Sequence, residues 1–283
     1  MLKQRIITAL LLLALLLPAL FASQPEPFAL FTLILITAGA WEWGRMNGLG
    51  RMASLLSGAL GLAICAALWW GGAITQTAAQ LWLLAGAAWV LLGAWMLLRG
   101  VAGWAQWPVA LRWPLGLVAL CLAWLALAQA RWMGPNFLLS VLVLVWAADV
   151  FAYFAGRALG GRWINAKLAA AISPGKTWEG VWGGMVGVLL VSLCWIQADR
   201  YFEFAVPSFH TRLWQQGAGF WLAALVFMTT MSVVGDLVES LIKRSAGVKD
   251  SSGLLPGHGG VLDRVDALLP TLPLAMMLVA WTT

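Results

Sequence analysis

The sequence has few charged residues and few side chains that bind metals. Asp, Glu, Lys and Arg make up only 10% of the 283 residues, and the chain has three cysteines and two histidines. Cys65, Cys121 and Cys194 lie singly within apolar runs, which predicts small buried side chains rather than a zinc site. The basic residues form no basic helix and accompany no aromatic RNA-binding motif, so we expect no nucleic-acid partner.

Long apolar runs occupy most of the chain. Hydrophobic residues make up 62% of it, and the runs have the roughly 17 to 25 residues needed to cross a ~30 Å hydrocarbon core. Because lipid cannot hydrogen-bond the backbone, and the alternation typical of membrane strands is missing, these spans are expected to be helices. We predict an all-α, polytopic integral membrane protein with about nine transmembrane helices. The predicted spans are residues 6–21, 27–43, 53–73, 81–98, 114–130, 136–156, 179–197, 219–242 and 265–281.

The distribution of basic residues predicts the orientation. With the N-terminus in the cytoplasm, only Arg131, Arg200 and Arg212 of the 17 Lys and Arg face outside. The positive-inside rule therefore favours an N-in, C-out topology. The run after Lys3 and Arg5 is similar to a secretory signal, but no small residue stands at the upstream cleavage position, so the first span is expected to remain. Residues 198–218 are predicted to form a solvated outer connector.

Charge, glycine and histidine are concentrated at residues 240–266 and on the helix before them. Asp236, Glu239, Ser240 and Lys243 stand at positions i, i+3, i+4 and i+7, so they share one helical face. A charged group in a membrane span costs about 2.5 to 3.5 kcal/mol and is normally kept for an ion, a substrate or a partner charge. Glu239 has a structural alternative, a pair with Lys243 worth a few tenths of a kcal/mol.

The turn Gly257-His258-Gly259-Gly260 follows on the same side of the membrane. Glycine reaches positive φ values, so successive backbone N–H groups can form a concave nest that suits phosphate oxygens. An ordinary loop is the alternative. His258 is predicted to donate a hydrogen bond to phosphate, since the other histidine, His210, lies across the membrane.

Carboxylates at both ends of this segment predict a magnesium site. Asp236 and Asp263 close the same inner loop, and two carboxylates with phosphate oxygens and water are a usual ligand set for Mg²⁺. Asp266 is predicted to assist or replace Asp263. Its alternative role is to complement the dipole of the ninth span. The sequence leaves open whether one or two cations bind, and whether they are divalent or monovalent.

A second inner loop adds further candidates. Asp149 and Tyr153 lie one turn apart in the sixth span, Asp149 about 10 Å from its inner end, where an acid again needs an explanation. Ser173, followed by proline, is typical of a helix N-cap. The Gly-Lys-Thr triplet does not form a P-loop, because Ala170 stands where a glycine is required and no strand is predicted before it. Lys176 is expected to contact phosphate, with a purely topological lysine as the alternative.

These motifs resemble the signature of the phosphatidate cytidylyltransferases, or CDP-diacylglycerol synthases. The chain reads Ser-x-Ile-Lys-Arg from Ser240, then Lys-Asp, then Pro-x-His-Gly-Gly-x-x-Asp-Arg-x-Asp from Pro256. The stretches Asp-x-x-Ala-Tyr from Asp149 and Ser-Pro-x-Lys-Thr-Trp-Glu-Gly from Ser173 are similar to the second block of that family. Gly175 departs from the pattern, because a second basic residue is expected there.

The resemblance implies transfer of the cytidylyl group of CTP to phosphatidic acid, giving CDP-diacylglycerol and pyrophosphate for phospholipid biosynthesis. It implies the cytosolic face of a bacterial-type inner (cytoplasmic) membrane, with Mg²⁺, CTP, phosphatidic acid and the lipid bilayer as partners; a homodimer is a further expectation. Residues 1–135 would form N-terminal membrane helices, and residues 136–283 would form C-terminal helices that carry the catalytic loops of one membrane domain. The implied catalytic residues are Asp236, Lys243, Asp263 and Arg264. The implied substrate-binding residues are Asp149, Tyr153, Ser173, Lys176, Thr177, Ser240, Arg244, Lys249, Asp250, His258, Gly259 and Gly260.

Two other functions fit parts of the pattern. The intramembrane acids Asp149 and Asp236 are also typical of a transporter or a lipid-binding membrane protein with a gated polar site, but such proteins show paired halves with broken helices. The chain has no internal repeat of that kind. A CTP-dependent lipid-alcohol kinase is the other alternative, and it differs in releasing CDP.

Overall fold

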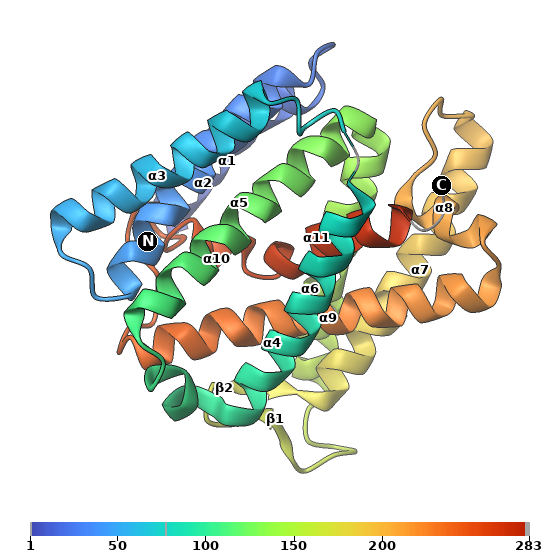
Figure 1. Cartoon of the computed structure of the whole chain (residues 1–283). Coiled ribbons are helices and arrows are strands. Elements are labelled where there is room, and N and C mark those ends of the chain that lie inside the picture. The colour runs from blue at the N-terminus through green and yellow to red at the C-terminus, as the bar shows by residue number, and fades with distance from the viewer. Residues whose placement is uncertain (1, 77, 281–283) are drawn as a thin grey trace.

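The structure, a computed structural model, describes residues 2–76 and 78–280 (Figure 1). Within these residues the only strands form one antiparallel hairpin. The helices are α1 (Leu2–Leu20), α2 (Glu26–Met46), α3 (Arg51–Trp70), α4 (Ala79–Ala105), α5 (Val109–Met133), α6 (Pro135–Leu159), α7 (Trp178–Phe202), α8 (Phe209–Gln215), α9 (Ala218–Ser245), α10 (Leu262–Val265) and α11 (Leu268–Ala280), and the strands are β1 (Lys167–Ala169) and β2 (Ser173–Thr177).

The fold is that of a helical, multi-pass membrane protein, but nine membrane-spanning helices are not confirmed. Each predicted span overlaps a helix, whereas seven of the described helices, α2 to α7 and α9, are long and apolar enough to cross a membrane. The apolar part of α1 is the shorter stretch Ile6–Leu20. Helix α11 has 13 residues, about 20 Å at 1.5 Å per residue, which is less than the ~30 Å core. Trp281, the end of the predicted ninth span, lies outside the described residues.

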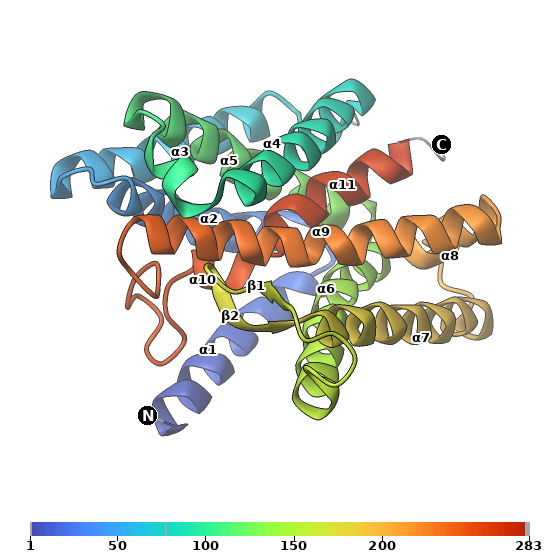
Figure 2. The ribbon, with the colours of Figure 1, turned by 90° about the horizontal axis from the view of Figure 1, so that it is seen from below.

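Helix α11 lies inside the bundle. It packs against α4, α5 and α9 (Figures 1 and 2). A Cβ added to Gly235 of α9 would lie 2.7 Å from the carbonyl oxygen of Asp266. Only glycine therefore lets α9, which carries Asp236, approach the chain just before α11 this closely.

Small residues also join α6 to α7. A Cβ added to Gly187 would lie 2.1 Å from Cγ of Phe151, and one added to Gly183 would lie 2.1 Å from Cβ of Ala155. Helices in membranes commonly approach each other through such small residues. The contact holds the C-terminal half of α6, with Asp149, against the N-terminal half of α7, which the hairpin precedes.

Residues 198–218 are a solvated connector only in part, because residues 200–205 and 215–218 are exposed, as predicted, but the others are buried or half-buried. Helix α7 continues to Phe202, and α8 follows it. The buried side chains of α8 are Phe209, His210 and Leu213. The segment is packed because Asp199 accepts hydrogen bonds from the Ser208 amide (2.8 Å) and from the side chains of Thr211 (2.6 Å) and Asn136 (2.9 Å). The Asn136 contact comes from α6, so a local sequence pattern does not reveal it.

Acidification is expected to destabilise the protein through His210. Burial lowers the pKa of this imidazole from the ordinary 6.5 to about 4, although the charge of Asp199 opposes the shift. Because the pKa is lower in the folded than in the unfolded chain, the contribution to stability is complete above about pH 6.5 and is lost as the pH falls towards 4. The loss is at most ~1.4 kcal/mol per pH unit.

The measurement is the melting temperature in detergent at about pH 8 and about pH 5, on either side of the ordinary histidine pKa. We expect a larger decrease on acidification in the wild type than in His210→Gln, which cannot take up the proton. The same decrease in both proteins would contradict the assignment.

Candidate active site

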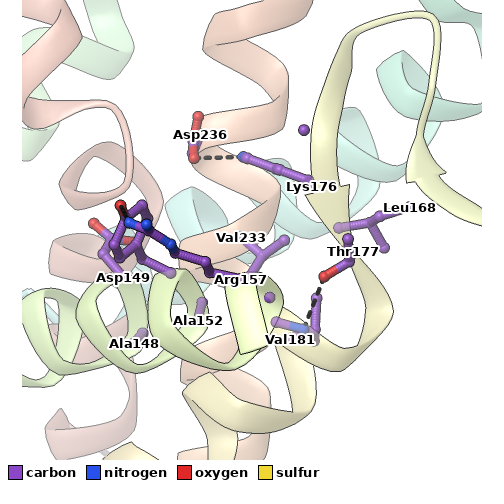
Figure 3. A pocket seen from close by; sticks show the side chains of 14 residues that line it. Ala148, Asp149, Ala152, Arg157, Leu168, Lys176, Thr177, Val181, Val233 and Asp236 are labelled. Atoms are coloured by element: carbon purple, nitrogen blue, oxygen red, sulfur yellow. Dashed lines mark hydrogen bonds and ion pairs between the residues drawn. The ribbon is translucent and has the colours of Figure 1, made fainter. Parts of the chain in front are cut away.

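A cavity of about 590 Å³ lies between α6, the hairpin and α9 (Figure 3). Its lining includes five of the predicted site residues. They are Asp149 and Tyr153 from α6, Lys176 and Thr177 at the end of the hairpin, and Asp236 from α9. The volume lies in the ~300 to 1,000 Å³ range of small-molecule sites. The fold therefore joins the two sequence blocks in one cavity.

The charged groups of the cavity are close to each other. Lys176 and Asp236 form an ion pair, and their side chains are 23% and 33% exposed (Figure 3). Asp149 interacts electrostatically with both. Arg157, which is not among the predicted site residues, lines the same cavity and donates a hydrogen bond to the Tyr153 hydroxyl (3.1 Å). Arg157 thus supplies a second cation near the position where Gly175 lacks one.

The predicted N-cap at Ser173 is wrong. Ser173 begins strand β2, and α7 begins only at Trp178, with Thr177 as its N-cap. The Thr177 hydroxyl accepts a hydrogen bond from the Gly180 amide (3.1 Å). Pairing of β2 with β1 keeps Ser173 extended. The expected absence of a strand before the Gly-Lys-Thr triplet is also wrong, although Ala170 still excludes a P-loop.

Lys243 joins α9 to Asp263, which directly follows the signature loop, residues 249–262. Its Nζ lies 2.6 Å from Glu239 and 2.6 Å from Asp263. The pair between Glu239 and Lys243 predicted as a structural alternative is therefore confirmed. On the cavity side of α9, the Ser240 hydroxyl lies 3.4 Å from Oδ1 of Asp236. Local helical spacing thus produces two polar clusters on one helix.

Asp263 is held by donors from three places. Its Oδ2 accepts hydrogen bonds from the amide (2.9 Å) and hydroxyl (2.8 Å) of Ser251 and from the Gly260 amide (2.8 Å). Burial alone would raise the pKa of Asp263, but hydrogen bonds from Lys243 and from the amides of Gly260 and Ser251 hold that pKa below its ordinary value. The carboxylate therefore stays ionised at neutral pH.

The amides at the end of the glycine-rich turn and just after it have partners within the protein. The Gly260 amide donates to Asp263, and the next two amides donate to Glu42 of α2. Arg264 donates to the carbonyl oxygen of His258 (2.9 Å). These amides therefore bind carboxylates of the protein itself, which is a structural role. Contact of His258, Gly259 and Gly260 with substrate stays a prediction.

Glu42 is a residue that the sequence analysis missed. It is fully buried, and all of its hydrogen bonds described here come from the signature loop. The sequence did contain a signal for this residue. Glu42 is an acid inside the second predicted span, and a charge in the membrane costs free energy there as it does at Asp236.

The remaining predicted residues lie at the exposed end of the site. Lys249 and Asp250 are exposed on the signature loop. Arg244 and Arg99 line a second cavity of about 790 Å³, whose other walls are mostly apolar. These side chains are accessible, but they do not line the cavity that contains Lys176 and Asp236.

Asp236 and the neighbouring Asp266 offer oxygens that suit a magnesium ion completed by substrate ligands, whereas Asp263 does not line the cavity. Among the described residues, no three His, Cys, Asp or Glu side chains form a ready-made metal cluster. Asp236 faces the cavity, and Asp266 interacts electrostatically with Asp236 and Asp149. Asp263 offers mainly Oδ1, which also accepts from Lys243. One or two carboxylates completed by substrate phosphates are a common arrangement for Mg²⁺.

Cations and carboxylates around one cavity of a helical membrane protein are the groups that a membrane enzyme acting on phosphate-bearing substrates needs. The chain matches the cytidylyltransferase family over residues 3–282 and belongs to it. It is 40% identical to the phosphatidate cytidylyltransferase of Pseudomonas aeruginosa, over 96% of this chain and 95% of that protein. It is 35% identical to that of Haemophilus influenzae, over 96% of each, and 36% identical to that of Brucella abortus, over 86% and 80%. The resemblance inferred from the signature is confirmed.

Proposed function

We propose that this protein transfers the cytidylyl group of CTP to phosphatidic acid, giving CDP-diacylglycerol and pyrophosphate. The observation that carries the proposal is its similarity, over nearly the full length, to proteins named phosphatidate cytidylyltransferase. The cavity supports it independently, because Lys176 and Arg157 bring cations to a pocket of nucleotide size beside acids that suit a metal.

The reaction needs positioning and charge neutralisation more than proton transfer. The nucleophile is an oxygen of the lipid phosphate, which is already ionised near neutral pH, so no general base is required. It forms a bond to the α-phosphorus of CTP, and the bond from that phosphorus to the pyrophosphate oxygen breaks. Cationic side chains can stabilise the charge that develops. Lys176 and Arg157 would hold anionic oxygens in the cavity, and Arg244, Lys249 and Arg264 would act at its exposed end.

Asp236 and Asp263, with Asp266, would hold magnesium together with phosphate oxygens of the substrates. When bound, the ion would neutralise phosphate charge and favour departure of pyrophosphate. Lys243 would keep Asp263 in place through the ion pair described above.

We further propose an N-in, C-out topology, with the site at the cytosolic face of the inner membrane. This topology requires helix α1 and the last predicted span to cross the membrane as well, because with crossings by α2 to α7 and α9 alone a cytoplasmic N-terminus would place residues 157–178 and 243–264 outside. The cavity lies where α6 and α9 lead into residues 157–178 and 243–264, the inner loops richest in Lys and Arg. The side chains of Lys3 and Arg5 lie outside the described residues. A homodimer stays a prediction.

The test uses purified protein, phosphatidic acid, Mg²⁺ and CTP labelled at either the α- or the γ-phosphate. We expect the α-label in the lipid product and the γ-label in pyrophosphate. A γ-label in the lipid, with release of CDP, would establish a lipid kinase instead. Movement of substrate across proteoliposomes without consumption of CTP would establish a transporter. Diacylglycerol in place of phosphatidic acid is the control, because it lacks the attacking phosphate.

A further inference from the structure

The carboxylate of Glu42 binds a loop that is far away in the sequence. Its Oε1 accepts hydrogen bonds from the Ser252 hydroxyl (2.5 Å) and the Val261 amide (2.9 Å). Its Oε2 accepts from the Ser251 hydroxyl (3.1 Å) and the Leu262 amide (2.9 Å). The side chain is 0% exposed. A buried carboxylate with four donors is held firmly, because hydrogen bonds to an ionised acceptor are strong and loss of the acceptor leaves the donors unpaired.

Ser251 links Glu42 to Asp263. Its hydroxyl lies 3.1 Å from Glu42 and 2.8 Å from Asp263, and its amide donates to Asp263 at 2.9 Å. Asp263 in turn binds Lys243. A continuous chain of polar contacts therefore runs from α2 through the signature loop to α9.

Gly260 gives independent evidence for this contact. A Cβ at this position would lie 2.4 Å from Oε1 of Glu42 and 2.1 Å from the Ser251 hydroxyl. Distances this short would force the carboxylate or the loop to move. The glycine therefore makes room for the acid of α2.

We propose that Glu42 is a positioning residue for cytidylyl transfer: it holds the signature loop so that Asp263 keeps its place beside Lys243. The inference rests on the proposed function for its kinetic consequence only. Glu42 lines no part of the cavity that contains Lys176 and Asp236, so it acts through the loop and does not contact the reacting atoms there.

The main test compares Glu42→Gln with Thr32→Val. Glutamine keeps the size of the side chain but presents an amide donor to groups that are themselves donors. We expect kcat to fall about 10²-fold, the effect of misplacing a site by about 1 Å, with a much smaller change in the KM for CTP. Glu42→Asp, which retains the charge, should recover part of the rate. Thr32 is buried in the same helix and donates only to carbonyls of its own helix (2.9 and 3.1 Å), so Thr32→Val should retain the wild-type kcat.

A second measurement tests the loop without reference to activity. Trypsin cleavage after Lys249 should be faster in Glu42→Gln than in the wild type in detergent, and cleavage after Arg162, an exposed site in another loop, should be unchanged. Faster cleavage with a lowered kcat supports the proposal. A wild-type kcat in Glu42→Gln overturns it. A lowered kcat also overturns it if the amount of folded protein falls in parallel and cleavage after Lys249 is not selectively faster. If the wild type proved inactive with CTP, the proposed function would fail while the cleavage result still tested the loop contact.

Discussion

Asp236→Asn is expected to abolish formation of CDP-lipid while leaving the fold intact. The side chain is 33% exposed and faces the cavity, where it pairs with Lys176. Asparagine has nearly the same size, but it removes the charge that orients Lys176 and that would bind magnesium. Because removal of one preorganised charge-stabilising group costs about 10² to 10³-fold, and this variant disturbs two, we expect a decrease of about 10³-fold or more.

The measurement is the initial rate with saturating CTP and phosphatidic acid, together with the melting temperature in detergent. Glu203→Gln is the matched control, because Glu203 is an exposed acid just after the C-terminal end of α7, away from the cavity. It makes the same change of charge and should retain the wild-type rate. Wild-type turnover in Asp236→Asn would refute both the metal assignment and the placement of the reaction in this cavity.

Lys243→Met is expected to cause the largest loss of stability. The side chains of Lys243, Glu239 and Asp263 are only 13%, 6% and 5% exposed. Methionine keeps most of the volume but leaves two nearly buried carboxylates without their shared cation. Breaking a buried pair in this way costs about 3 to 5 kcal/mol, which corresponds to a decrease of roughly 10 °C in melting temperature for a protein of this size.

A double variant separates stability from catalysis. Adding Glu239→Gln to Lys243→Met removes one of the uncompensated charges, so part of the melting temperature should return. Activity should stay low, because Asp263 still lacks its cation. An unchanged melting temperature in Lys243→Met would mean that the ion pairs do not stabilise the fold.

The parts of the site that depend on local spacing followed from the sequence. The i,i+4 spacing of Glu239 and Lys243 predicted their pair, and the structure forms it. Helical periodicity sets these neighbours whatever the rest of the fold does. Assembly of Asp149 with Lys176 followed less directly, from the inference that both loops lie on one side of the membrane.

Prediction from sequence was wrong or incomplete where a residue contacts a segment that is distant in the chain. Ser173 has the sequence of a helix cap, but pairing with β1 makes it a strand residue. The glycine-rich turn has the sequence of a phosphate nest, which stays a prediction, and the structure adds that the Gly260 amide donates to Asp263 while the Val261 amide just after the turn donates to Glu42. Glu42 on α2 lies 209 to 220 residues before its partners in the signature loop, and no local propensity encodes such a contact.

The sequence by itself determined that this protein is a helical membrane protein of the cytidylyltransferase family, because span length and polar motifs are local properties of the chain. Only the tertiary structure decided which carboxylates face the cavity and which hold the signature loop. Asp236 and Glu42 are both acids within apolar helices. Helix packing exposes Asp236 beside Lys176 and buries Glu42 among four donors, and it is this packing that separates a group available to a ligand from one that positions the loop.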